Sequence, residues 1–263
     1  LVERSLRIHL LGFIAASKKP SKEKINEFFS QTFGGLSDKT LKSKISKCLE
    51  DLKEFDMIID EGGFKPTDYG QKVFWLRINP KTAQEITDCL DNYVGGRKHT
   101  FGFLHMITHL PEFYPQFDAT KKLRKDFDEK YSETIKKEKL YRNQKVDQDY
   151  TKSLIILYYW IDGMTHAEMS AKPLNAEPGD IFQISQNAKR FAYIIREIAK
   201  FWVHEKKHEK KHEKIVEDIV DDLHPLIQRI KYGVPEDYLD LVKIKNIGRV
   251  RAKELYEKKI ENR

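Results

Sequence analysis

The sequence predicts a mainly α-helical protein with one small β-hairpin near its N-terminus. Over most of the 263 residues, apolar side chains recur at intervals of three and four, which is the spacing of a buried helix face. The one clear strand–turn–strand pattern spans residues 57–66, around Gly62-Gly63. No apolar run approaches the roughly 18 residues of a membrane span, so we expect no membrane partner.

The first 80 residues are expected to form one domain with the winged-helix order of elements. Three helical stripes come first, at residues 6–13, 25–33 and 41–52. Gly34-Gly35 is expected to end the second helix, and Ser37 or Asp38 to cap the third. The hairpin follows, and Thr67 is expected to cap the helix after it. Three helices, a hairpin and a further helix are the order of a winged helix.

Residues 81–223 are expected to form a helical bundle. The segment 154–161 is apolar on all sides, which favours a buried central helix. A helix that starts near Gly179 carries a core stripe at helical spacing. The members of this stripe are Ile181, Ile184, Ala188, Phe191, Ile195, Ile198 and Trp202.

The opposite face of that helix is a candidate binding surface. It carries Gln183, Gln186, Arg190 and Tyr193, with Glu197 as its only acid. Arg and Tyr side chains can stack on nucleic-acid bases without reading sequence. Periodicity alone favours an ordinary solvated face, and both interpretations remain open at this point.

Residues 224–263 are expected to form a small basic domain that resembles a helix-hairpin-helix. In such hairpins, backbone N–H groups at a helix start hold a DNA phosphate. Asn246 stands where a first glycine is usual and can adopt the left-handed backbone that this position needs. The candidate contacts are Lys243, Lys245, Asn246, Gly248, Arg249 and Arg251. The alternative is an ordinary helical hairpin with a basic surface.

Composition fits a nucleic-acid partner and a reducing compartment. The net charge of +7 favours a polyanion, although a solvated lysine-rich surface explains it equally well. Cys48 and Cys89 are the only cysteines and are expected to be small buried hydrophobes. They form neither a disulfide framework nor a zinc spacing, which fits the cytoplasm.

The chain carries no pattern of catalytic or cofactor-binding residues. It lacks the G-x-x-x-x-G-K-[ST] phosphate loop and an Asp-Glu-x-His box, so we expect neither ATP hydrolysis nor a cofactor. His204, His208 and His212 repeat every four residues, but Glu and Lys repeat with them, which favours a solvated helix over a metal site. Lysines crowd the third helix, which would be the recognition helix of a free winged-helix protein; they are Lys39, Lys42, Lys44 and Lys47.

Several short motifs, in this order, resemble the C-terminal half of the archaeal Hjm helicase family, a HelQ-related, Ski-two-like branch of superfamily two. They are Arg7–Leu11, Phe28–Phe33, Pro66–Gly70, Leu104–Ile107, Trp160-Ile161, Pro178–Asp180 and Ile247–Ala252 with Leu255-Tyr256. The resemblance covers essentially the whole chain. It implies a winged helix, a seven-helix ratchet domain, and a helix-loop-helix domain that we expect to be truncated at Arg263.

The resemblance also implies a role for the helix after Gly179. In such helicases the ratchet domain closes a ring on two RecA-like motor domains, and single-stranded DNA threads through. The family typically stacks an Arg and a Trp, seven residues apart, on the DNA. Gln183 and Arg190 stand at those positions here. The family's winged helix mainly docks the motor domains, which weakens the expectation of DNA contacts by Lys42 and Lys47.

We therefore expect the DNA-binding module of an ATP-dependent 3′ to 5′ DNA helicase that acts in repair or at stalled forks. Its expected partners are single-stranded or forked DNA and the RecA-like motor domains of the same polypeptide, which would bind ATP and magnesium. An independent winged-helix transcription regulator is one alternative. The equivalent module of a Ski-two-like RNA helicase is another.

Overall fold

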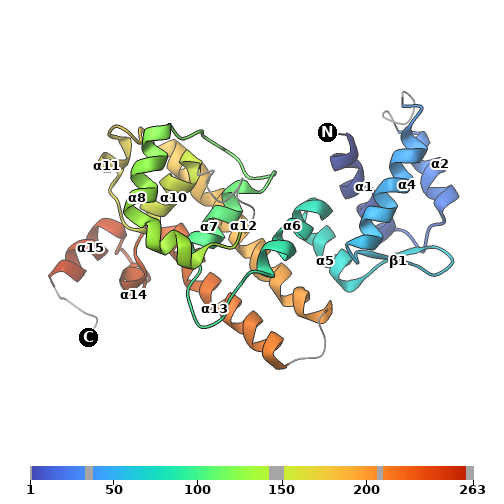
Figure 1. The fold of residues 1–263 in the computed structure, drawn as a ribbon. Helices are drawn as coiled ribbons and strands as arrows, with labels where there is room; N and C mark the ends of the chain where they lie inside the picture. Colours follow the sequence, from blue (N-terminus) through green and yellow to red (C-terminus); the bar gives the residue numbers. More distant parts are fainter. Residues whose placement is uncertain (1, 33–37, 142–150, 206–209, 259–263) are drawn as a thin grey trace. The chain divides into compact units, whose positions relative to one another are not determined.

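The computed structural model describes residues 2–32, 38–141, 151–205 and 210–258 (Figure 1). The chain divides into two compact units, Leu1–Thr87 and Asp88–Arg263. Both are built from helices, and the described strands form a single two-stranded sheet, so the prediction of a mainly α fold with a small hairpin is confirmed. The finer domain boundaries expected at 80/81 and 223/224 stay predictions.

The N-terminal unit has the winged-helix order. Its elements are α1 (Val2–Ala16), α2 (Lys22–Ser30), α4 (Leu41–Glu54), β1 (Ile58–Asp60), β2 (Phe64–Pro66) and α5 (Asp68–Leu76). The strands pair antiparallel, with Ile58 opposite Pro66. Helix α1 packs against α4, α5 and β2, and α2 packs against α4. Cys48 lies in this core, as expected.

The turn from β2 into α5 depends on Thr67 and Gly70. The Thr67 hydroxyl accepts the Gly70 N–H at 2.9 Å, which caps the helix as predicted. The same hydroxyl donates to the Asp56 carbonyl at 2.6 Å. A Cβ on Gly70 would lie 1.9 Å from the Met57 carbonyl oxygen, so only glycine lets the helix approach the hairpin this closely.

The cap expected for the third helix was wrong. Helix α4 starts after Thr40, not after Asp38, and Ser37 lies outside the described residues, as does the Gly34-Gly35 stop. The Asp38 carboxylate instead accepts the Thr40 N–H at 2.8 Å and pairs with Lys44 at 2.7 Å. These contacts lower the pKa of Asp38 to about 2, with the Lys44 hydrogen bond as the largest cause.

The C-terminal unit is a helical bundle with a short tail. Its helices are α7 (Thr100–His109), α8 (Lys121–Glu138), α10 (Lys152–Ile161), α11 (His166–Ser170), α12 (Pro178–Glu205), α13 (Lys210–Tyr232), η1 (Glu236–Tyr238), α14 (Leu239–Val242) and α15 (Arg249–Glu257). Helix α6 (Pro80–Leu90) spans the boundary between the units. Helix α13 runs through the expected 223/224 boundary and contains Pro225.

Helix α10 is the buried centre of this bundle, as the sequence predicted. It packs against α7, α12 and α13 (Figure 1). Its residues from Leu154 to Leu157 are all buried. Helix α12 packs along α13 and also against α7. His105 of α7 was expected at the edge of the core, but it is fully buried among aromatic rings, 5.4 Å from the Phe101 ring.

Trp160, near the end of α10, joins α10 to the end of α13. Its indole Nε1 donates to the Ile230 carbonyl at 2.8 Å. Gly233 follows α13 with φ +66°, and a Cβ there would lie 2.3 Å from the Trp160 ring. The chain can turn across the indole face only because Gly233 has no side chain.

A buried polar cluster closes the bundle near the start of α7. His99 is fully buried, and its two ring nitrogens lie 3.0 Å from the Glu138 carbonyl and 3.1 Å from the Val94 carbonyl. The Glu138 carboxylate accepts the Phe101 N–H at 2.7 Å. Burial raises the pKa of Glu138 above its ordinary value of 4.5, although the Phe101 hydrogen bond and His99 oppose the shift. This carboxyl therefore prefers its neutral form in the folded protein more than in the unfolded chain.

We predict that Gly233→Ala destabilises the protein by more than about 2 kcal/mol, which would lower the melting temperature by roughly 4 °C or more. The left-handed backbone and the collision with Trp160 both penalise a Cβ. Thermal melting followed by circular dichroism measures the effect. Gly179→Ala is the matched control, because a Cβ there meets nothing within 4 Å. Equal melting temperatures for the two variants would show that Gly233 is not required for the contact with Trp160.

We predict that Glu138→Gln reduces the loss of stability as pH rises. Because the pKa of Glu138 is raised in the folded state, its contribution is greatest below about pH 4.5 and is lost as the carboxyl ionises at higher pH. The amide of the substituted side chain would still offer an acceptor to the Phe101 N–H. Between about pH 4.5 and pH 8, the melting temperature should therefore fall less with pH for the variant than for the wild type. Glu133→Gln, at an exposed position of the same helix, should leave the pH profile unchanged.

Candidate nucleic-acid interface

Helix α12 has one buried face and one exposed face. The predicted core stripe is confirmed from Ile181 to Ile198, and Trp202 lies beyond the side chains that the structure describes. Ser185, Ala192 and Ile194 are buried as well, so the buried face is wider than the stripe alone. The helix is held along this face by α7, α10 and α13.

The opposite face holds the four residues that the sequence singled out. Gln183, Gln186, Arg190 and Tyr193 are all exposed. Gln186 accepts a hydrogen bond from the Lys189 ammonium at 2.9 Å. The Arg190 guanidinium lies 5.1 Å from the Phe191 ring centroid. The structure therefore brings these four side chains onto one surface, as expected; whether they contact DNA stays a prediction.

The exposed face is basic because its expected acid is buried. Glu197 is only 7% exposed and forms ion pairs with Lys200 at 2.7 Å and with Arg196 at 3.4 Å. The segment 181–196 contains Lys189, Arg190 and Arg196 and no Asp or Glu. This segment of α12 therefore offers cations, and no carboxylate of its own, to a phosphate backbone.

Two exposed aromatic residues were missed in the sequence. Phe182 is 63% exposed on α12, and Tyr114 is 71% exposed in the segment after α7. The Asn187 amide donates to the Tyr114 carbonyl, which places Tyr114 beside α12. The sequence could have indicated that Phe182 is exposed, because Phe182 lies outside the spacing of the core stripe. Tyr114 carried no such signal, since it lies in a loop.

The tail folds around a small apolar core of its own. Val234, Leu239, Leu241, Val242 and Ala252 form this core. Asn246 has φ +68°, which is the left-handed backbone expected at this position. Gly248 caps α15 without a side-chain hydrogen bond, and the space where its Cβ would stand is open. A phosphate oxygen could therefore approach the first N–H groups of α15.

The other candidate cations of the tail differ in how they are held. Lys243 and Lys245 are exposed, and Lys243 pairs with Asp240 at 2.8 Å. The Arg251 guanidinium donates to the Asn246 carbonyl at 2.8 Å and braces the hairpin loop while remaining exposed.

Arg249 is placed differently from the contact that the sequence suggested. Its guanidinium stacks 4.0 Å from the Trp160 ring centroid and donates to the Met164 carbonyl at 2.7 Å. Burial lowers the pKa of Arg249 to about 10, and Glu168 opposes part of this shift. The side chain therefore fastens α15 to the bundle, with only part of its surface left for solvent.

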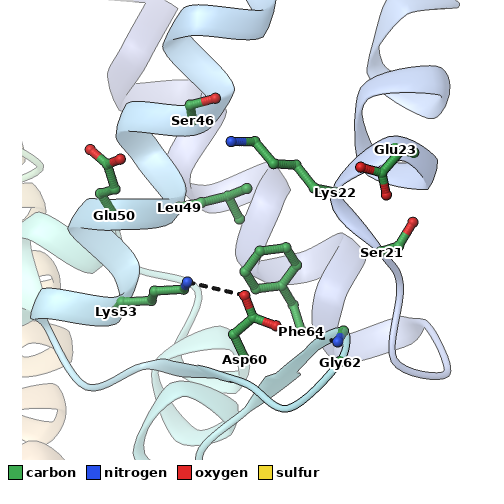
Figure 2. A pocket seen from close by; sticks show the side chains of 11 residues that line it. Ser21, Lys22, Glu23, Ser46, Leu49, Glu50, Lys53, Asp60, Gly62 and Phe64 are labelled. Atoms are coloured by element: carbon green, nitrogen blue, oxygen red, sulfur yellow. Dashed lines mark hydrogen bonds and ion pairs between the residues drawn. The ribbon is translucent and has the colours of Figure 1, made fainter.

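The N-terminal unit carries a cleft of about 340 Å³ between the start of α2, α4 and the hairpin (Figure 2). Phe64 and Leu49 supply its apolar wall, and Lys53 pairs with Asp60 across it at 3.2 Å. Glu23, Glu50 and Lys22 also line it. Because acids outnumber lysines there, the cleft does not favour a polyanion.

On α4 and the residue before its cap, Lys39, Lys42 and Lys47 are exposed.

The described part of the chain shows neither a metal cluster nor a membrane helix. Within the described ranges, no group of three His, Cys, Asp or Glu side chains could hold a metal ion. The structure does not describe the side chains of His204, His208 and His212, so the expectation about them is untested. No described helix is both long and apolar enough to cross a bilayer.

Comparison with known proteins identifies the bundle. A family model described as "Archaeal helicase, domain 4" matches residues 101–233, about half of the chain. Over 97% of its length, the chain is 29% identical to proteins named ATP-dependent DNA helicase Hel308 from Pyrococcus abyssi and Pyrococcus horikoshii. A Hel308 protein from Methanocaldococcus jannaschii is 28% identical over 95% of the chain.

The chain spans 35% of the two Pyrococcus relatives and 19% of the Methanocaldococcus relative. The matched residues run from the second residue of α7 to just past the end of α13, and so include the long helix α12 with its basic, aromatic face. The resemblance noted in the sequence agrees with this match. The chain therefore belongs to the archaeal helicase domain 4 family.

Proposed function

We propose that this chain is the DNA-binding module of an ATP-dependent 3′ to 5′ DNA helicase that acts in repair or fork processing. Single-stranded or forked DNA would be its ligand, and RecA-like motor domains of a longer polypeptide its partners. The printed sequence has no phosphate loop, so ATP and magnesium would be held by those other domains. In this proposal the chain itself binds DNA and does not catalyse.

One observation carries the proposal: the exposed face of α12 combines cations, amides and aromatic rings with no acid from residue 181 to 196. Cations attract any phosphate backbone, while rings and guanidinium groups stack on any base. This combination suits a strand that slides past the helix, because it holds DNA without reading its sequence. The family match supports the same role, since the relatives are named as DNA helicases.

The tail offers a second point of contact. The open start of α15 would hold one phosphate through backbone N–H groups, with Lys245 and Arg251 adding charge around it. Lys243 would contribute less, because Asp240 already pairs with it. The expected pathway of the DNA thus combines stacking on α12 and phosphate binding at the tail.

We predict that the 263-residue chain binds single-stranded DNA with a steep salt dependence and little sequence preference. Fluorescence anisotropy with unrelated labelled oligonucleotides, measured over a series of salt concentrations, checks this. The affinity should fall as salt rises because bound counterions are released from the phosphates. A tenfold preference for one duplex sequence would favour a transcription regulator instead, and no binding at low salt would contradict the proposal.

We predict that Arg251→Ala and Arg249→Ala separate binding from stability. Arg251→Ala should weaken DNA binding, with little change in melting temperature. It should also reduce the dependence of the affinity on salt concentration by the amount expected for about one phosphate contact. Arg249→Ala should lower the melting temperature as well, because it removes the stacking on Trp160 and leaves the Met164 carbonyl without its donor. Anisotropy and thermal melting on the same samples measure both effects. An Arg249→Ala protein that melts like the wild type would show that this side chain is not structural.

A further inference from the structure

The exposed aromatic rings of α12 lie on a different line from the residues that the family resemblance pointed to. At 3.6 residues per turn, Phe182 and Tyr193 are separated by about three turns and about 20°. Gln186 lies between them, within about 40° of both. Gln183 and Arg190 also align with each other, but about 80° further round the helix. The helix therefore presents two parallel lines of side chains. We call Phe182, Gln186 and Tyr193 the aromatic line, and Gln183 and Arg190 the polar line.

We propose that single-stranded DNA runs along the Phe182–Gln186–Tyr193 line, with one base stacked on each ring. This inference rests on the proposed function and specifies where on α12 the DNA lies. Phe182 and Tyr193 are 63% and 45% exposed, so both rings are open to a ligand. On the other line, Gln183 has no π face, and the Arg190 guanidinium lies against its own neighbour Phe191, 5.1 Å from the ring centroid.

The Tyr193 ring is held ready for stacking. The Arg196 guanidinium lies 4.9 Å from its centroid, which fixes one face of the ring by a cation–π contact. With 45% of the side chain exposed, the ring still offers surface to a base. Arg196 is itself held by Glu197, at 3.4 Å. This support limits the side-chain entropy that Tyr193 would lose on binding.

The charges beside the line fit a nucleic acid. Lys189 and Arg196 project on one side of the line and Arg190 on the other, by the geometry of the helix. Cations on both sides of two rings, in a segment 181–196 that contains no Asp or Glu, complement a chain of phosphates with attached bases. An apolar protein partner would gain nothing from these three cations and would have to desolvate them.

The distance between the rings sets the length of DNA involved. About eleven residues of α-helix span about 16 Å. At the roughly 3.4 Å rise of a B-form strand this equals about five bases, and an extended strand would cover it with fewer. Phe182 and Tyr193 would thus contact bases that are not adjacent, with Gln186 available to hydrogen-bond to the DNA between them.

The test compares the two lines in the full 263-residue chain. Phe182→Ala and Tyr193→Ala should each weaken binding to single-stranded DNA by about fivefold or more, the lower end of the effect of losing one stacked base. Gln183→Ala should stay within about twofold of the wild type, because it removes no stacking surface. Tyr193→Phe and Phe182→Trp keep a ring and should also bind normally. Binding is measured by fluorescence anisotropy at low salt.

A second readout reports stacking directly. An oligonucleotide with 2-aminopurine at successive positions should lose fluorescence where a base stacks on Phe182 or Tyr193, and the corresponding alanine variant should remove that quenching. Circular dichroism melts within about 2 °C of the wild type are expected, because both side chains are exposed. Trp75→Ala, which removes an exposed aromatic residue in the N-terminal unit, controls for nonspecific loss of aromatic surface.

The outcomes separate this inference from the proposed function. If Gln183→Ala and Arg190→Ala abolish binding while the two ring variants bind normally, the DNA runs along the polar line; the inference is overturned and the proposed function stands. If the wild-type chain binds no single-stranded DNA at low salt, the proposed function itself fails. Loss of binding and of 2-aminopurine quenching in the ring variants alone supports the aromatic line.

Discussion

Trp160 is the side chain at which the bundle and the tail of the C-terminal unit meet. Its Nε1 donates to the Ile230 carbonyl at the end of α13, its ring lies against Gly233, and the Arg249 guanidinium stacks on it. Trp160 therefore contacts three different segments through its large apolar surface, one hydrogen bond and one cation–π contact. The start of α15 keeps a defined position relative to the bundle because Arg249 is held on this ring. The open helix start at Gly248, and any ligand that it binds, depend on that attachment.

Helix α12 combines a face that packs in the bundle with an exposed face that we propose binds DNA. Its buried face is wide enough for three neighbouring helices, which leaves a narrow exposed strip. Phe182 and Tyr193 are 63% and 45% exposed, so their rings contribute less apolar burial to folding than rings in the core do. Glu197 would have been the natural counter-charge on this strip, yet it is buried between Arg196 and Lys200. The resulting surface suits the DNA ligand that we propose for it.

The buried polar groups of the bundle hold its helices in one arrangement. His99 is completely enclosed, and the carboxyl groups of Glu138 and Asp222 beside it both have raised pKa values because burial disfavours their charge. Tyr93 donates to Asp222 at 2.8 Å and partly offsets that burial. These hydrogen bonds join the segment before α7 to α8 and α13. Such groups hold the helices in one arrangement, because any other packing would leave a buried polar atom without a partner.

The sequence by itself determined the helical fold, the hairpin, the core stripe of α12 and the left-handed Asn246, because periodicity and local backbone preference act over a few residues. It also located the exposed face of α12, since that face is the complement of the stripe. Tertiary structure decided the rest. The burial of Glu197 and the stacking of Arg249 on Trp160, which stands far earlier in the printed sequence, depend on which helices pack together. Nothing in local spacing could reveal that an arginine in a basic hairpin is held by a distant indole, because the contact exists only once both segments are folded.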